Sequence, residues 1–294
     1  MSQRLSDAEL RLCQTIQAQL ASEVWMDVMA GYTALREHAS PAIGRRLSRG
    51  LEVSPAGYVL VADSAASQPH LLNAQWRMTV ALLVLRATGQ LDGRKVLDLH
   101  QARGLSNVDA LAGLTALRHL SLQECSALTC VAGLTGMVGL ERLDLTMCTR
   151  LNDLGPLSTL TGLQRLEIGP NFGMTDVNAL ASMGALISLD LSYCEALVDL
   201  EGLRPLAQLE SLNLSDCGAL VQIDAVAGLT GLKNLDLGGC GSLRNVDGVV
   251  DLAQLERIDL TGCDALEPVA WRARFRGRAE CTALRYEIRQ RLSA

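Results

Sequence analysis

One pattern recurs through the middle of this chain at a fixed period. A degenerate first copy opens at Arg94 and the last copy closes at residue 269. Seven further copies begin at a leucine, each twenty-three positions after the previous start, namely at Leu117, Leu140, Leu163, Leu186, Leu209, Leu232 and Leu255. Because the spacing never slips, the pattern predicts a solenoid of eight units that stack on one another.

Each copy divides into two parts with different periodicities. Positions 4 and 6 are aliphatic, as in Leu189 and Leu191, and this alternation predicts a short strand. The next aliphatic residues follow at a spacing of three, as in Leu197, Leu200, Leu203 and Leu206. That spacing favours extended or 3₁₀-like chain. Stacked strands then form a parallel sheet, and the bulkier return segments place this sheet on the concave side.

The repeat resembles a known family. The pattern LxxLxLxxCxxLxxLxxLxxLxx is similar to a leucine-rich repeat, and one full instance comprises Leu140, Leu143, Leu145, Cys148 and Leu151. Returns such as 151–162 resemble the internalin-like class, and the cysteine resembles the cysteine-containing class. The resemblance covers 94–269, well over half of the chain. It implies an α/β fold that is a curved leucine-rich-repeat solenoid, and such repeats usually bind other proteins without shared catalytic residues.

The segments that flank the array are predicted to cap it, because an end repeat would otherwise expose its aliphatic columns. We divide the chain into a mostly helical segment, 1–93, the repeats, 94–269, and a basic C-terminal cap, 270–294. The first segment is either only a cap or an independent interaction domain.

Local signals place the elements of the N-terminal segment. Ser6 and Glu9 have capping-box spacing, and an apolar helical stripe follows to about Ala30. We further expect a helix over 42–49, a strand over 58–61 and a helix over 71–88. The loop 62–69 is the segment that we expect to be most flexible.

The C-terminal segment alternates aromatic residues with arginines from Trp271 to Arg278. We expect Trp271 and Phe275 to seal the last repeat while the arginines reach water. The alternative is a small basic patch for an acidic partner. A short amphipathic helix should follow, with an apolar face formed by Cys281, Leu284, Ile288 and Leu292.

Position 9 of the repeat forms a column of small residues. It contains Ala102, Cys125, Cys148, Asn171, Cys194, Cys217, Cys240 and Cys263. Cysteine and asparagine can both hydrogen-bond buried main chain, so Asn171 favours a structural ladder of reduced thiols. Disulfides and a metal site are the alternatives. We expect no metal and no cofactor, and reduced thiols favour a cytoplasmic location.

Charge is distributed unevenly and bears on the partner. The array holds 11 basic and 22 acidic residues, whereas 270–294 holds seven basic and two acidic ones. A net charge of −11 on the array argues against nucleic acid and anionic membranes as ligands. The longest apolar run, 80–85, is far too short for a membrane span, and the first residues do not resemble a cleaved export signal.

Catalytic motifs are not evident. The sequence contains no P-loop, HExxH, GxSxG or dinucleotide-binding glycine pattern. Asp98, His100 and Ser121 would lie near one another on the sheet, but the histidine would have to bridge about a strand's width and no oxyanion donors are evident. An enzyme with a site between the N-terminal segment and the first repeats is therefore the third of three functional hypotheses.

The other two hypotheses use the concave sheet face. Position 5 is acidic in most copies, and position 3 supplies arginines beside it. This acidic stripe is either a solvated ladder of ion pairs or a surface that recruits a basic protein partner. The predicted binding residues are Arg142, Asp144, Met147, Arg165, Glu167, Phe172, Asp190 and Tyr193. The first hypothesis is a non-catalytic interaction scaffold, and the second is a bacterial effector that acts inside another cell through the same surface.

Overall fold

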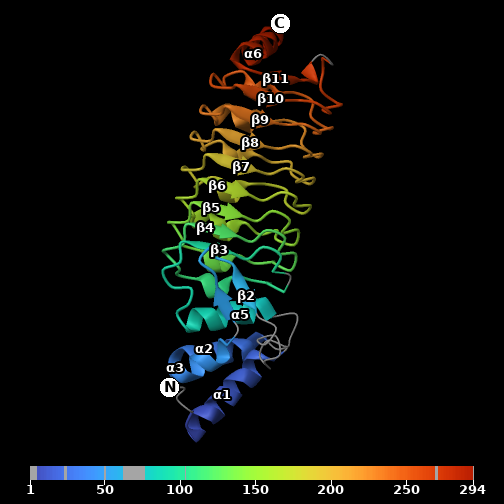
Figure 1. Cartoon of the computed structure of the whole chain (residues 1–294). Coiled ribbons are helices and arrows are strands. Elements are labelled where there is room, and N and C mark those ends of the chain that lie inside the picture. Colours follow the sequence, from blue (N-terminus) through green and yellow to red (C-terminus); the bar gives the residue numbers. More distant parts are fainter. Residues whose placement is uncertain are drawn as a thin grey trace.

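The computed structural model describes residues 5–22, 25–49, 51–61, 77–102, 104–268 and 271–293. The chain forms an elongated stack of coils with helices at both ends (Figure 1). The predicted loop 62–69 and the first residues of the predicted helix 71–88 lie outside the described residues.

A nine-stranded sheet runs along one side of the stack, in the order β11-β10-β9-β8-β7-β6-β5-β4-β3. Eight of its strands recur at the period of the repeat: β3 (Val96–Asp98), β4 (His119–Ser121), β5 (Arg142–Asp144), β6 (Arg165–Glu167), β7 (Ser188–Asp190), β8 (Ser211–Asn213), β9 (Asn234–Asp236) and β10 (Arg257–Asp259). They pair in parallel, so that Leu143 of β5 is in register with Leu120 and Leu166. The structure thus confirms the predicted leucine-rich-repeat solenoid and its eight strands.

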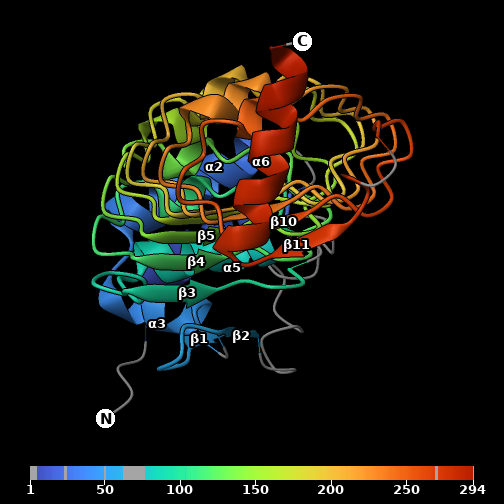
Figure 2. The same ribbon diagram turned by 90° about the horizontal axis from the view of Figure 1, so that it is seen from above.

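The return segments are short 3₁₀ helices, as the spacing of three predicted. Their bounds are η2 (Asp109–Leu111), η3 (Ala132–Leu134), η4 (Gly155–Thr159), η5 (Asn178–Leu180), η6 (Glu201–Leu203), η7 (Asp224–Gly228) and η8 (Asp247–Val249). Seen along the stack, the coils superimpose with the sheet along one side (Figure 2). Close stacking requires glycine in several returns. A Cβ on Gly202, for example, would lie 2.2 Å from the Val177 carbonyl oxygen of the preceding repeat.

One continuous aliphatic core fills the molecule. It extends from Cys13 in the first helix to Ile288 in the last one. Position 4 of each strand is buried, whereas positions 3 and 5 face outward on the concave face. The side chains available to a ligand on this face are therefore those at positions 3 and 5 and in the loop that follows each strand.

The N-terminal segment contains α1 (Asp7–Leu20), α2 (Trp25–His38), α3 (Pro41–Leu47), β1 (Leu51–Val53), β2 (Val59–Val61) and α5 (Arg77–Ala87). The Ser6–Glu9 capping box is confirmed. The predicted helix to Ala30 was wrong, since α1 ends at Leu20 and the chain folds back as α2. Gly31 permits this close pair, because a Cβ there would lie 2.9 Å from the Gln19 Cβ.

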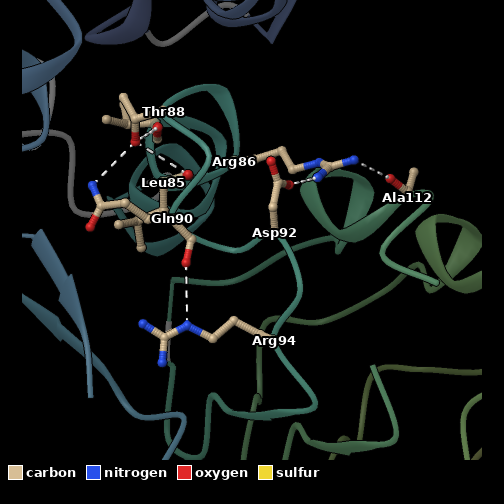
Figure 3. A network of polar contacts seen from close by, with 8 residues as sticks. Leu85, Arg86, Thr88, Gln90, Asp92, Arg94 and Ala112 are labelled. Atoms are coloured by element: carbon tan, nitrogen blue, oxygen red, sulfur yellow. Dashed lines mark hydrogen bonds and ion pairs between the residues drawn. The ribbon is translucent and has the colours of Figure 1, made fainter. Parts of the chain in front are cut away.

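Polar side chains at the junction hold main-chain carbonyls (Figure 3). Thr88 Oγ1 donates to the carbonyl of Val84 at 2.9 Å, and Gln90 Nε2 donates to Thr88 Oγ1. Arg86 pairs with Asp92 and reaches the Ala112 carbonyl at 3.3 Å. The contact with Ala112 joins α5 to the first repeat.

The β1–β2 hairpin covers the N-terminal edge of the long sheet. Tyr58 bridges Asp98 in parallel, and the Asp98 amide donates to the Gly57 carbonyl at 2.9 Å. Gly57 has φ +97°, and a Cβ there would lie 2.6 Å from the Val96 carbonyl oxygen. Only glycine therefore fits this turn against the edge strand β3.

The C-terminal cap consists of β11 (Arg274–Arg276), antiparallel to β10, and α6 (Arg278–Leu292). Trp271 is buried and its Nε1 donates to Glu287 at 3.0 Å. Cys281, Leu284 and Ile288 are buried as predicted. Leu292 was assigned wrongly to this apolar face; it is 58% exposed because the last turn of α6 extends past the core.

None of the helices in the described parts of the chain is long and apolar enough to cross a membrane.

Candidate functional site

The acidic stripe at position 5 is bound to the main chain of its own repeat. In six repeats the side-chain Oδ1 accepts the amide N–H two residues later, at 2.8 to 3.0 Å. The acceptors are Asp98, Asp144, Asp190, Asn213, Asp236 and Asp259. These bonds end each strand and begin the turn, which explains why asparagine serves as well as aspartate. We did not predict this role from the sequence. The presence of Asn213 at a position that is otherwise mostly aspartate was the signal that could have indicated it.

The described residues do not form the ladder of ion pairs that was one interpretation of this stripe. Among them, the carboxylates of the stripe pair only with His100, which contacts Asp98 at 2.9 Å, and with Arg274, which contacts Asp259. The arginines at position 3 were expected beside the stripe, yet Arg142 and Arg165 belong to none of the ion pairs found in the described chain. Both guanidinium groups therefore remain available on the concave face.

The pKa of the Glu167 carboxyl is raised above its ordinary value. Partial burial raises the pKa of Glu167, and the neighbouring Asp144 and Asp190 raise it further, while Arg165 lowers it. These three acids lie on the adjacent strands β5, β6 and β7, in register with one another. A cation placed over them would relieve this repulsion.

Three large apolar side chains are exposed in the loops that follow these same strands. Met147 is 43%, Phe172 54% and Tyr193 49% exposed. They occupy three successive repeats, so their loops are spaced by about 4.8 Å. We give the name central patch to these three residues and the outward side chains predicted with them: Arg142, Asp144, Met147, Arg165, Glu167, Phe172, Asp190 and Tyr193.

Two members of the central patch have an unfavourable backbone. Met147 has φ +62° and Tyr193 has φ +57°, at position 8 of their repeats. The seventh and eighth repeats place Gly239 and Gly262 there, also at positive φ. A side chain in this left-handed region costs on the order of 1 kcal/mol relative to glycine. Gln101, Glu124 and Asp216 have the same left-handed backbone at position 8, so this conformation belongs to the turn of the repeat and is not particular to the central patch.

A hollow of about 1140 Å³ lies further along the concave face, over β7 to β11. Its floor is made of short polar side chains at position 3, among them Ser188, Ser211 and Asn234. Arg274 and Arg276 of β11 close one end. Only Asp190 belongs to both the hollow and the central patch. The sequence did not predict this site. One end of the hollow is formed by β11, an antiparallel strand that lies outside the repeats and has no counterpart in their pattern.

The cysteine column lies behind the concave face. Five thiols donate to the position 6 carbonyl of the preceding repeat at 3.1 to 3.3 Å. The five donor thiols belong to Cys125, Cys148, Cys217, Cys240 and Cys263. Asn171 instead donates to the Leu151 carbonyl at 2.6 Å and accepts two amides of its own loop. Position 9 thus supplies a hydrogen bond to main-chain groups that are shielded from water.

The N-terminal segment also contains a cavity, of about 510 Å³, between α2, α3 and α5. Among the described residues that line it, Arg45 is the one with an ionisable side chain. Within the same described ranges, no group of three or more His, Cys, Asp or Glu side chains is placed to hold a metal ion. His100 contacts Asp98 and stacks edge-on against Tyr58.

Solved structures with the same architecture include proteins from bacteria. The leucine-rich repeat domain of the type III effector XopL is 20% identical, with a TM-score of 0.52, over 93% of this chain and 94% of that one. A leucine-rich repeat protein of Leptospira interrogans is 23% identical, with a TM-score of 0.51, over 59% of this chain and 45% of that one. The internalin InlF of Listeria monocytogenes is 21% identical, with a TM-score of 0.45, over 87% and 82%.

The first two likenesses, together with the nine-stranded sheet, define the class: the chain is a leucine-rich repeat protein by fold. At identities this low they show the fold alone. Neither a family model nor a curated protein sequence matches the chain.

Proposed function

We propose that this protein is a non-catalytic scaffold that binds a partner protein through its concave face, with the central patch as the main contact. The observation that carries the proposal is the exposure of Met147, Phe172 and Tyr193 in three consecutive repeats. Large apolar side chains that are surrounded by polar residues are typical of the positions that dominate binding energy in protein interfaces.

The charges of the central patch favour a partner with a basic group at this point. Partial burial is the main cause of the raised pKa of Glu167, and repulsion from Asp144 and Asp190 raises it further. A lysine or arginine from the partner would be drawn to these carboxylates and would speed association. The excess of acidic residues in the array supports a protein partner over nucleic acid or an anionic membrane. The buried, reduced thiols of the cysteine column suit a cytoplasmic location.

The test is affinity capture from a lysate of the source organism, with quantified recovery of each captured protein. Phe172→Ala combined with Tyr193→Ala should lower recovery of the partner by about tenfold or more. The melting temperature should stay nearly unchanged, because both side chains are exposed. Met26→Ala combined with Tyr286→Ala is the matched control, since these side chains are 74% and 63% exposed away from the concave face. Equal recovery with both double variants would refute the central patch.

A second proposal is that the protein is a bacterial effector that uses the same face inside another cell. It is favoured by the match to the repeat domain of an effector over nearly the full length of both chains. A translocation reporter fused to the full chain tests it. Delivery of the reporter through a specialised secretion system would support it, and retention in the producing cell would exclude it.

A further inference from the structure

Two arginines face each other at the C-terminal end of the hollow. Arg257 of β10 is the register partner of Arg276 of β11. Their neighbours Ile258 and Phe275 are packed against the core, so both arginine side chains project onto the concave face. Directly opposite residues of an antiparallel pair have Cβ atoms about 5 Å apart, and like charges there are destabilising.

The other cations of the hollow are already neutralised. Arg274 pairs with Asp259, and Arg278 pairs with Glu256 at 3.1 Å. In contrast, none of the hydrogen bonds or ion pairs formed by the described residues involves the guanidinium group of Arg257 or Arg276. Two guanidinium groups thus lie side by side without a counter-ion.

The other carboxylates of the hollow, and Glu280 at the start of α6, accept hydrogen bonds, and among the described residues none of them forms an ion pair with the two arginines. Asp190 accepts from the Ser192 amide and from Asn213 Nδ2, and Asp236 accepts from the Gly238 amide. Glu280 accepts the main-chain amide of Arg276 at 2.6 Å. The α6 helix also begins here, and its N-cap residue Gly277 supplies no side-chain acceptor. The positive end of a 15-residue helix therefore adds to the charge of the two arginines.

We propose that Arg257 and Arg276 form an anion site that receives a carboxylate from an extended, acidic segment of the partner protein. This inference rests on the proposed function, because the partner supplies the carboxylate. Planar guanidinium groups bind carboxylates through two parallel hydrogen bonds. The short side chains Ser188, Ser211 and Asn234 leave room along the floor of the hollow for the main chain of such a segment.

Protection of the sheet edge is a simpler reason for arginines on β11, since charged side chains on an edge strand discourage pairing with another chain. Arg274 meets that need and is held by Asp259. Edge protection does not account for Arg257, which lies on β10 inside the sheet. Edge protection also does not explain why Arg257 and Arg276 lie together without a counter-ion.

The test uses the full chain labelled with nitrogen-15 in its arginines and a twelve-residue Gly-Ser peptide that carries two adjacent glutamates. Titration at low salt should shift the side-chain Nε–H signals of Arg257 and Arg276 in a saturable manner. Arg257→Gln combined with Arg276→Gln should weaken binding by about tenfold or more. The same peptide with glutamines in place of the glutamates should not bind.

The matched control is Arg150→Gln combined with Arg244→Gln. These arginines are exposed, remove the same charge and line neither the hollow nor the central patch. They should change the affinity for the peptide by less than about twofold. Equal weakening by both pairs, or binding of inorganic phosphate with the same arginine dependence but not of the glutamate peptide, would overturn the proposal. Because the probe is a peptide, a failure here leaves the capture experiment on the central patch intact.

Discussion

At the residue scale, the acidic stripe has two separable roles. The Asp144 carboxylate accepts the Thr146 amide at 2.9 Å, and Asn213 shows that an amide side chain does the same. The charge of these residues is therefore free to serve binding, while one oxygen serves the turn.

Substitutions at Asp144 should distinguish these roles. Asp144→Ala removes the acceptor and should lower the free energy of unfolding by about 1 kcal/mol, whereas Asp144→Asn keeps the acceptor and should change it by less than about 0.5 kcal/mol. Urea denaturation measures both values. If Asn and Ala destabilise equally, the charge rather than the hydrogen bond matters to the fold.

The buried thiols predict a loss of stability at alkaline pH. Burial raises the pKa of the Cys125, Cys148, Cys194 and Cys240 thiols to about 12. In the unfolded chain the pKa of a cysteine is about 8.5. Below that pH the thiols are protonated in both states, and the stabilising effect is complete. Between the two pKa values the unfolded chain releases protons that the folded chain retains, so stability falls as pH rises.

This prediction is checked by denaturation between pH 8 and pH 11 under reducing conditions. A chain with Cys125→Ala and Cys148→Ala should start from lower stability but lose less of it over that interval. The contrary result would be an equal slope in both chains. It would mean that groups other than these thiols control the alkaline transition.

At the element scale, the sequence predicted the repeated parts of the fold more completely than the unrepeated ones. Eight strands and the 3₁₀ returns followed from the spacing of leucines, because stacking forces each copy into the same shape. The helical pair α1–α2 depends on Gly31 packing against Gln19, a contact between residues with no periodic relation. The pairing of β11 with β10 likewise depends on a reversal that only the folded chain shows.

The C-terminal cap offers a prediction about one helix. Ile288 is fully buried in α6 and Leu292, one turn later, is 58% exposed. Ile288→Ala should lower the free energy of unfolding by about 2 to 4 kcal/mol, and Leu292→Ala should leave it within about 0.5 kcal/mol. Thermal or urea unfolding measures the difference. Similar losses for the two variants would show that the last turn of α6 is packed more tightly than the structure indicates.

At the scale of the whole molecule, the repeats place different chemistry at different points of one face. The central patch lies over β5 to β7, with exposed apolar side chains beside three crowded carboxylates. The hollow lies over β7 to β11 and ends in two unpaired arginines. A partner that binds both surfaces would present basic and apolar side chains to the central patch and an acidic segment to the hollow.

The candidate site was only partly predictable from sequence for the same reason. Counting positions within the repeat placed Met147, Phe172 and Tyr193 correctly at exposed loops. The left-handed backbone of Met147 and Tyr193 could have been inferred from Gly239 and Gly262 in the same column. The pairing of Arg257 with Arg276 could not, since it joins the last repeat to a strand outside the array.

The central claim, that the concave face of repeats three to five contacts a protein partner, is tested most directly by hydroxyl-radical footprinting of the complex with the captured partner. Met147, Phe172 and Tyr193 should be protected when the partner binds. Met26 and Tyr286, equally reactive side chains exposed on α2 and α6, should be modified as in the free chain. Protection of Met26 or Tyr286 with unchanged modification of the three central side chains would contradict the account.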